Sequence, residues 1–191
     1  MADPIDATGF AIFETPIGAC GIAWGPRGIT GLQLPETTAQ GTRARMRRRW
    51  AGVTETAPPP EVQRAIDRIL ALLAGEAVDL GDITLDLAAA PDFHRKVYEV
   101  ARTIPPGQTM TYGEIAKRLG EPHESREVGQ AMGKNPIAII MPCHRVLGAD
   151  GKMGGFSANG GVATKRRILE IEGAAAVSAG PLFAGLDQRR G

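Results

Sequence analysis

Met141-Pro-Cys-His-Arg-Val146 is the stretch around which the rest of this 191-residue chain is organised. It places a nucleophile, a candidate base and a cation at consecutive positions. Upstream, Gly133-Lys-Asn-Pro-Ile-Ala-Ile-Ile140 is a polar turn followed by an apolar, β-branched run, which predicts a short buried strand that delivers Cys143. Downstream, Gly148-Ala-Asp-Gly-Lys-Met-Gly-Gly-Phe-Ser157 is a glycine-rich loop.

The composition is that of a globular protein. Hydrophobic residues make up 43% of the chain, enough for a sizeable core in one domain or two small ones. No apolar run approaches the roughly 18 residues that a membrane span requires. The N-terminal Met1-Ala-Asp-Pro-Ile-Asp6 lacks the basic and apolar regions of a signal peptide. We therefore expect a soluble, cytoplasmic protein without a membrane partner.

The two cysteines differ in their surroundings. They provide no disulfide framework, and in a reducing compartment a lone thiol is either inert core or a working nucleophile. Cys20 lies in Gly18-Ala-Cys-Gly-Ile22 with no His, Asp or Glu beside it, which indicates buried filler. The soft metal-ligand candidates are Cys20, Cys143, His94, His123 and His144. No pair of them has a zinc-ligand spacing, so the sequence predicts neither a metal nor a cofactor.

The N-terminal part predicts a small α/β domain. Short β-type runs alternate with Gly and Pro over residues 10–13, 21–24 and 29–34, which is typical of an antiparallel meander, and 82–87 is expected to close the sheet. Helices are expected over 37–50, with a basic face, and over 58–75. Ala88-Ala-Ala-Pro91 reads as a linker, so the predicted domains are 1–88 and 89–173. Residues 174–191 are expected to form a loosely packed tail.

The second predicted domain is mainly α-helical. Asp92 is placed to cap a helix that ends at Ile104-Pro-Pro-Gly107. Thr111 and Glu114 have the spacing of a capping box, and Ser125 is placed to cap a second short helix. Two short helices joined in this way predict a winged-helix-like helix-turn-helix. Such a pair is also common in proteins that never touch DNA, so the pattern alone leaves DNA binding open.

The net charge of +1 is not that of a strongly basic nucleic-acid-binding domain, but the charge is unevenly distributed. Two segments are rich in cations, namely Arg43, Arg45, Arg47, Arg48 and Arg49, and Lys165, Arg166 and Arg167. Each cluster fits either a basic surface for phosphates or a solvated helix face.

Cys143 has the neighbours of a reactive thiol. A thiol attacks as its thiolate, and His144 is the obvious base. Adjacent residues on an extended chain point to opposite sides, so either the backbone turns sharply here or a water carries the proton. Glu172, at the end of an otherwise apolar helix, is a candidate to orient the imidazole. The alternative interpretation of Cys143 and His144 is a buried, inert cysteine beside a surface histidine.

Five motifs occur in order between residues 93 and 173. They are Thr111-Tyr-Gly-Glu-Ile-Ala116, Arg126-Glu-Val-Gly-Gln-Ala-Met132, Gly133-Lys-Asn-Pro136, Pro142-Cys-His-Arg-Val146 and Leu169-Glu-Ile-Glu-Gly173. This series resembles the O6-alkylguanine-DNA alkyltransferase family, also called methylated-DNA-protein-cysteine methyltransferases. Thr15-Pro-Ile-Gly18 and the strand pattern are consistent with that family's N-terminal α/β, ribonuclease-H-like domain.

The resemblance implies DNA repair by direct reversal of damage. Cys143 would take the alkyl group from guanine O6 irreversibly, so that one protein repairs one base. His144, acting through water, would be the base, and Glu172 would hold it. The implied partner is double-stranded DNA that carries O6-alkylguanine, bound by a monomer with no obligate protein partner.

The resemblance also assigns contacts to DNA and to the flipped base. Arg126 resembles the finger that fills the vacated stack. Tyr112, next to the DNA-contacting Gly113, resembles the residue whose ring rotates a phosphate and whose hydroxyl donates to guanine. Asn135 would bridge the helix pair to the active-site strand. The substrate pocket would be lined by Tyr112, Val146, Phe156 and Ser157.

Two departures from the family pattern concern this pocket. Family members usually have Tyr where this chain has Phe156, and the loop Ser157-Ala-Asn-Gly-Gly161 is longer than in many relatives. The preferred size of the alkyl group therefore stays open. The alternative functions are a lesion sensor or helix-turn-helix regulator that does not repair, and an unrelated cysteine hydrolase, which would leave Tyr112, Arg126 and Asn135 without a role.

Overall fold

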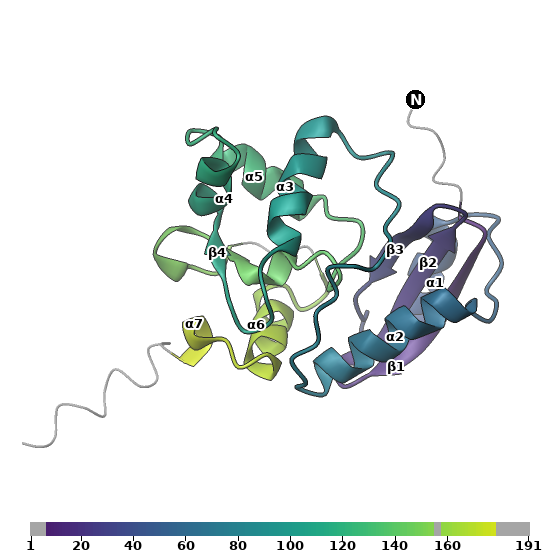
Figure 1. Cartoon of the computed structure of the whole chain (residues 1–191). Helices are drawn as coiled ribbons and strands as arrows, with labels where there is room; N and C mark the ends of the chain where they lie inside the picture. Colours follow the sequence, from purple (N-terminus) through teal and green to yellow (C-terminus); the bar gives the residue numbers. More distant parts are fainter. Residues whose placement is uncertain (1–6, 155–157, 179–191) are drawn as a thin grey trace, which may run out of the picture.

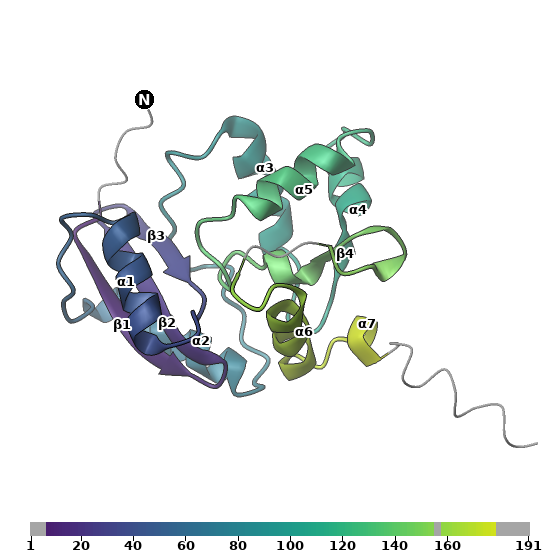
Figure 2. The same ribbon diagram turned by 180° about the vertical axis from the view of Figure 1, so that it is seen from behind.

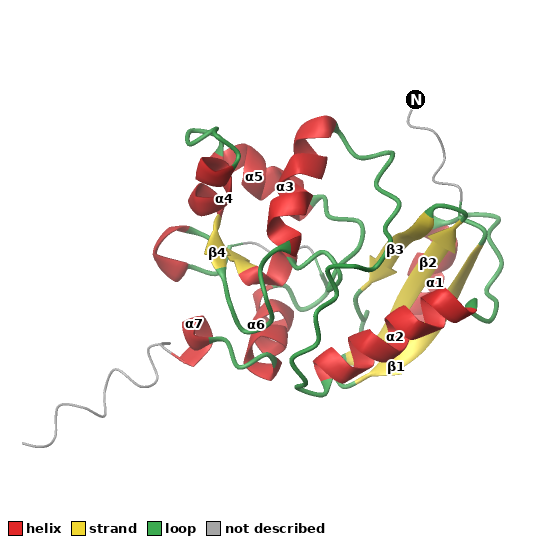
Figure 3. Cartoon of the chain, viewed as in Figure 1, coloured by secondary structure: helices red, strands yellow, loops and turns green. Residues whose placement is uncertain are grey.

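The chain forms a sheet-containing N-terminal part and a helical C-terminal part that lie side by side (Figures 1 and 3). The structure is a computed structural model that describes residues 7–154 and 158–178. It confirms the predicted fold class, an α/β part with a small antiparallel sheet followed by a mainly α part.

The N-terminal sheet is the predicted antiparallel meander. Its strands β1 (Gly9–Thr15), β2 (Gly18–Gly25) and β3 (Gly28–Gln33) pair in sequence order. Tight turns join them, and Gly18 and Gly28 adopt positive φ angles of 117° and 128°, which favour glycine. The meander is therefore fixed by local turn chemistry together with the β-type runs.

Two helices cover opposite faces of this sheet (Figure 2). Helix α1 (Ala39–Arg49) begins after Thr38, whose side chain accepts a hydrogen bond from Gly41 N–H at 3.0 Å. Helix α2 (Pro60–Leu73) begins at a proline and packs six buried residues against the other face. Both helices were expected from the sequence, with slightly wider bounds.

The prediction of a strand over residues 82–87 that closes the sheet is wrong. The segment makes one isolated parallel bridge between Ile29 and Leu85. Two hydrogen bonds frame that bridge, from Ile29 N–H to Thr84 O at 3.1 Å and from Asp86 N–H to Ile29 O at 2.8 Å. Asp86 also binds Arg27, which draws this segment along β3 without forming a regular ladder.

Helices dominate the C-terminal part. They are α3 (Asp92–Arg102), α4 (Tyr112–Arg118), α5 (Ser125–Gly133), α6 (Val162–Ile171) and α7 (Ala175–Ser178). Two short strands, β4 (Met110–Thr111) and β5 (Val146–Leu147), pair in parallel beneath them. Helices α3, α4 and α5 share one core, and the Tyr98 hydroxyl donates to Ala131 O at 2.9 Å across it.

The predicted helix caps have different outcomes. The capping box is confirmed, because the Thr111 side chain accepts from Glu114 N–H and the Glu114 carboxylate accepts from Thr111 N–H. The other two caps are wrong. Asp92 is the first residue of α3 and pairs with Arg95, and Ser125 is the first residue of α5 and makes no cap bond. In both cases the helix begins one residue earlier than its polar side chain suggests.

The run before Cys143 is a turn and not the predicted strand. Ile139 has a φ of +69°, and Met141 N–H donates to Ile137 O at 2.9 Å. Ile137, Ile139 and Ile140 pack into the core of the N-terminal sheet and α2. Met141 and Cys143 belong to the core under α3, α4 and α5. The chain therefore passes from one core to the other immediately before the cysteine.

The C-terminal segment differs from the predicted loose tail at its beginning. Ala174 is 2% exposed and packs with Leu147 and Leu169, and α7 follows it. In the part of the chain that the structure describes, no helix combines the length and apolarity needed to cross a bilayer.

Candidate functional site

Cys143 lies in a sharp backbone turn. Residues Cys143–Arg145 form a single 3₁₀ turn, in which Arg145 N–H donates to Pro142 O at 2.9 Å. The backbone therefore turns sharply at the cysteine, as one of the two expected arrangements requires, and a water can still carry the proton between the two side chains. Cys143 is 8% exposed at the bottom of a pocket, and His144 is fully buried beneath the surface.

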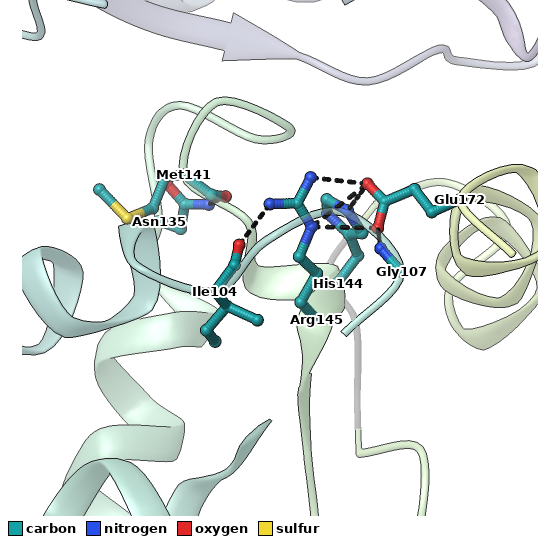
Figure 4. A network of polar contacts seen from close by, with 7 residues as sticks. All are labelled: Ile104, Gly107, Asn135, Met141, His144, Arg145 and Glu172. Atoms are coloured by element: carbon teal, nitrogen blue, oxygen red, sulfur yellow. Dashed lines mark hydrogen bonds and ion pairs between the residues drawn. The ribbon is translucent and has the colours of Figure 1, made fainter. Parts of the chain in front are cut away.

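His144 is part of a buried ionic cluster (Figure 4). Its Nε2 lies 2.8 Å from Glu172 Oε1, at the end of α6. Arg145 holds the same carboxylate with two nitrogens, through Nη2–Oε1 at 2.8 Å and Nε–Oε2 at 3.0 Å. Arg145 Nη1 also donates to Ile104 O at 2.7 Å, and Gly107 N–H donates to Glu172 Oε2 at 3.3 Å. The cluster ties the active-site turn to α6 and to the loop after α3.

The cluster fixes which imidazole nitrogen carries the proton. An ionised carboxylate such as Glu172 has no proton and can only accept hydrogen bonds, so Nε2 of His144 must be the donor. Nδ1 is then the nitrogen with the free lone pair, and it is buried without a hydrogen-bond partner among the described residues. The imidazole is therefore oriented to accept a proton at Nδ1.

The charges of this site follow from burial and from these contacts. Burial acts to raise the pKa of Glu172, but the hydrogen bonds from His144 and Arg145 and the guanidinium charge of Arg145 outweigh it and lower the pKa to about 2. Burial lowers the pKa of His144 despite Glu172, so the imidazole is neutral at neutral pH. Burial also raises the pKa of the Cys143 thiol, against a hydrogen bond with Asn135 and the charge of Lys165. A thiol of this kind needs a base.

Asn135 connects the end of α5 to the loop that precedes the cysteine. Its Nδ2 donates to Met141 O at 2.9 Å (Figure 4). Its Oδ1 accepts from Ile137 N–H at 2.9 Å. The side chain thereby closes residues 135–141 into a ring. Cys143 N–H donates to the same Met141 oxygen at 2.8 Å, and Asn135 lines the pocket beside the thiol, where it acts to lower the pKa of Cys143.

The pocket above the thiol has a cavity volume of about 120 Å³. The C-terminal part lines it with Tyr112, Met132, Gly133, Asn135, Ala138, Cys143, Ala158 and Lys165, and the N-terminal part with Leu32, Gln33, Leu34, Arg45 and Arg49. Burial raises the pKa of Tyr112, which keeps its hydroxyl protonated as a donor. The pocket therefore joins both parts of the chain around one thiol.

The remaining predicted residues lie in different places. Arg126 is exposed in the first turn of α5, and Gly113 is in the first turn of α4. Val146 is fully buried in β5, paired with Met110. Phe156 and Ser157 lie outside the described residues.

Three contributors were not predicted as site residues. Arg145 anchors Glu172, and its only sequence signal was its place beside His144. Lys165 is 1% exposed and donates from Nζ to Val146 O at 2.6 Å, next to the cysteine turn. Arg49 reaches the pocket from α1. The position of Lys165 among the apolar residues of α6 was a signal in the sequence. Arg49 had no such signal, because only the packing of the two parts brings it to the pocket.

We expect Lys165→Met to slow the reaction of Cys143. Methionine retains the length of the side chain, whereas the loss of the ammonium charge removes one of the influences that lower the pKa of the thiol. The rate of DNA-free alkylation by iodoacetamide at neutral pH should fall by about tenfold, as expected for one pKa unit. The pH midpoint of that reaction should rise. Arg166→Met, at the exposed next position, is the control, and equal profiles for both variants would contradict the expectation.

Cys20 and the histidines are not arranged as a metal site among the described residues. Cys20 is fully buried, and burial raises its pKa to about 12, which fits the predicted inert filler. In the ranges 7–154 and 158–178, no group of three or more His, Cys, Asp or Glu side chains is placed to hold a metal ion.

Known proteins resemble this chain over most of its length. Residues 92–174 match the family described as 6-O-methylguanine DNA methyltransferase, DNA binding domain. A methylated-DNA–protein-cysteine methyltransferase of Mycobacterium bovis is 40% identical over 163 residues, which cover 85% of this chain and 91% of that protein. One of Methanothermobacter thermautotrophicus is 34% identical over 158 residues, covering 83% and 81%. The crystal structure of Mycobacterium tuberculosis OGT in complex with DNA has a TM-score of 0.71 at 37% identity, covering 89% of this chain and 98% of that one.

Proposed function

Because the chain belongs to the methylated-DNA–protein-cysteine methyltransferase family, we propose that Cys143 is the residue that accepts the alkyl group from O6-alkylguanine. The protein is a methyltransferase that repairs DNA by direct reversal of damage. The observation that supports Cys143 is that it lines a pocket and is followed in the same 3₁₀ turn by His144, which is buried and paired with Glu172. Cys20, the other thiol, is fully buried in the sheet of the N-terminal part.

The transfer is a displacement at the alkyl carbon. The Cys143 thiolate forms the sulfur–carbon bond with its own electron pair, and the bond from that carbon to guanine O6 breaks. The departing electron pair stays on the guanine, which takes up a proton. The Tyr112 hydroxyl, which lines the same pocket, donates a hydrogen bond as this negative charge develops.

The thiol proton leaves before the displacement. His144 takes it at Nδ1 through one water, while Nε2 remains bonded to Glu172. Glu172 stays ionised and stabilises the imidazolium that results, and Arg145 keeps the carboxylate in place. The product is a thioether, in which the sulfur has lost its nucleophilic thiolate, so each protein acts once.

The DNA-binding surface is the helix pair α4 and α5. A base inside a duplex is out of reach of a buried thiol, so the alkylated guanine must be flipped into the pocket. Arg126 is exposed at the start of α5, where its planar guanidinium fills the stack that the base leaves. Gly113, at the start of α4, allows close approach of the phosphate backbone, and the helix pair enters the minor groove.

We expect Arg126→Ala to slow repair of duplex DNA without affecting the thiol. Unstacking a base costs a few kcal/mol, and loss of the filling side chain should lower the transfer rate by about a hundredfold. The DNA-free reaction of Cys143 with iodoacetamide should stay at the wild-type rate. Arg64→Ala, an exposed arginine on α2, provides the matched control. Equal losses in both reactions would mean that Arg126 acts on the fold.

The reaction is tested by its stoichiometry. Excess duplex with one O6-methylguanine is incubated with the protein, and the lesions that remain are counted after digestion. We expect repair to stop at one lesion per protein. Continued turnover would contradict the suicide mechanism. A protein that binds the lesion and leaves it intact would be a sensor, which is the alternative.

The working form is a cytoplasmic monomer with DNA as its partner. A nucleophilic thiol must stay reduced, which a reducing compartment ensures. Both cysteines are free thiols in the structure. The reaction needs no cofactor, because the cysteine itself is the acceptor.

A further inference from the structure

A residue of the N-terminal part reaches the loop that precedes the acceptor cysteine. Arg49, the last residue of α1, donates from Nη2 to Pro136 O at 3.1 Å. Leu32 N–H, in β3, donates to the same oxygen at 3.0 Å. We call these two donors and the Pro136 carbonyl the Pro136 clamp. The clamp ties the loop to α1 and β3 of the N-terminal part.

The guanidinium of Arg49 is itself held in place. Its Cζ lies 4.3 Å from the centroid of the Trp50 ring, a cation–π contact. Trp50 is 5% exposed and wedged against β3, because a Cβ added at Gly31 would lie 2.1 Å from the ring atom Cζ2. The ring therefore cannot shift toward the sheet, and it forms a fixed platform for the donor.

The loop depends on anchors of this kind. Ile139 has a φ of +69°, a conformation that is unfavourable for a β-branched residue and persists only where the surrounding structure enforces it. Its side chain is 1% exposed in the core of the N-terminal part. The N-terminal part thus enforces the shape of the loop at two points, the buried Ile139 and the clamped Pro136 carbonyl.

The clamp is one residue away from a partner of the thiol. Asn135 precedes Pro136 and donates one N–H to Met141 O at 2.9 Å. Cys143 N–H donates to the same oxygen at 2.8 Å, so the amide and the cysteine share one acceptor. The Asn135 amide also acts to lower the pKa of the thiol. Arg49, Asn135 and Cys143 line the same pocket. A shift of Pro136 would therefore move the amide that stabilises the thiolate.

We propose that Arg49 is a positioning residue for the acceptor thiol, acting through Pro136 and Asn135. The N-terminal part would thereby set the reactivity of Cys143, and one arginine of the basic segment 43–49 would serve the reaction through the loop that precedes the cysteine. The proposal deepens the proposed function and rests on Cys143 being the acceptor.

The test compares Arg49→Met, Arg49→Lys and Arg48→Met in two reactions. The first is DNA-free alkylation of the thiol by iodoacetamide, followed over pH, in which the buried Cys20 stays unreactive. The second is methyl transfer from a duplex with one O6-methylguanine. For Arg49→Met we expect both rates at neutral pH to fall by about fivefold to tenfold, the size expected for one hydrogen bond, and the pH midpoint to rise. Arg49→Lys, which retains a donor, should be intermediate, and Arg48→Met should keep the wild-type pH midpoint.

Two results would overturn the proposal. One is an Arg49→Met profile within twofold of wild type. The other is a lower melting temperature with an unchanged pH midpoint, because a merely structural arginine has no effect on the ionisation of a folded thiol. Failure of the proposed function has a different signature. If wild type transfers no methyl group but Arg49→Met still raises the pH midpoint, the positioning role stands and the assigned reaction fails.

Discussion

Cys143→Ala is expected to abolish repair and to leave lesion binding intact. The sulfur is the only atom of the side chain that forms a bond to the alkyl carbon, so no slower route remains. The proposed DNA contacts on α4 and α5, including Arg126, are unchanged by the substitution. The effect on folding should stay within about 2 kcal/mol, because a small buried side chain is replaced by a smaller one.

The measurement for Cys143→Ala is analysis of the DNA, together with a binding assay. Duplex with O6-methylguanine should come back unrepaired and should still be retained by the protein in a gel-shift experiment. Cys20→Ala is the control and should repair at the wild-type rate, since Cys20 is fully buried and its pKa is about 12. Repaired guanine in the Cys143→Ala reaction would mean that another residue accepts the group.

Glu172→Gln should damage both stability and activity. The substitution leaves Arg145, which is 5% exposed, with a neutral partner, and breaking a buried ion pair costs about 3–5 kcal/mol. A protein of this size should then melt on the order of 10 °C lower. Glu170→Gln, an exposed position on α6, is the control and should melt like wild type.

The loss of activity in Glu172→Gln follows from the tautomer of His144. A glutamine has one acceptor oxygen, and Arg145 occupies both oxygens of the native carboxylate. If the oxygen faces Arg145, the amide N–H₂ faces His144 Nε2 and drives the proton to Nδ1. The imidazole can then no longer accept the thiol proton, and transfer should slow by about a hundredfold at a temperature where the variant is folded. A wild-type rate would rule out this orientation of the proton relay.

The same variant has a predicted pH signature. Glu172 has a folded-state pKa of about 2 against 4.5 for the free side chain, so its contribution to stability is fully present above 4.5. That contribution is lost as the pH falls from about 4.5 toward about 2. The difference in free energy of unfolding between wild type and Glu172→Gln should therefore shrink on acidification through this window. A constant difference, measured by urea unfolding at each pH, would contradict the depressed pKa.

The sequence was most informative where local chemistry decides the structure. Strands over 10–34 and the capping box of Thr111 and Glu114 depend on neighbours in the chain, and both were predicted. The pairing of Glu172 with His144 was proposed because Glu172 stands at the end of an otherwise apolar helix, and the resemblance implied the same role. The family motifs then located the reactive residues along the chain.

The failures concern structure that is set by long-range packing. Residues 137–141 are as apolar and β-branched as a strand, but they bridge two cores and turn at Ile139 with a positive φ. The segment 82–87 pairs with β3 only at Leu85. Arg49 and Lys165 lie far from Cys143 in the sequence, and only the packing of α1 and α6 brings them to its pocket. The secondary-structure propensity of a single segment does not determine such long-range contacts.

Mass spectrometry of the protein after reaction tests transfer to Cys143 most directly. Wild-type protein is incubated with an equimolar duplex carrying one O6-methylguanine, and its intact mass and its proteolytic peptides are measured. We expect the mass to increase by one methyl group per protein, located on the peptide that contains Cys143. An unchanged mass in a sample that is reduced, folded and bound to the lesion, or a methyl group on any other peptide, would contradict the assignment of Cys143 as the acceptor.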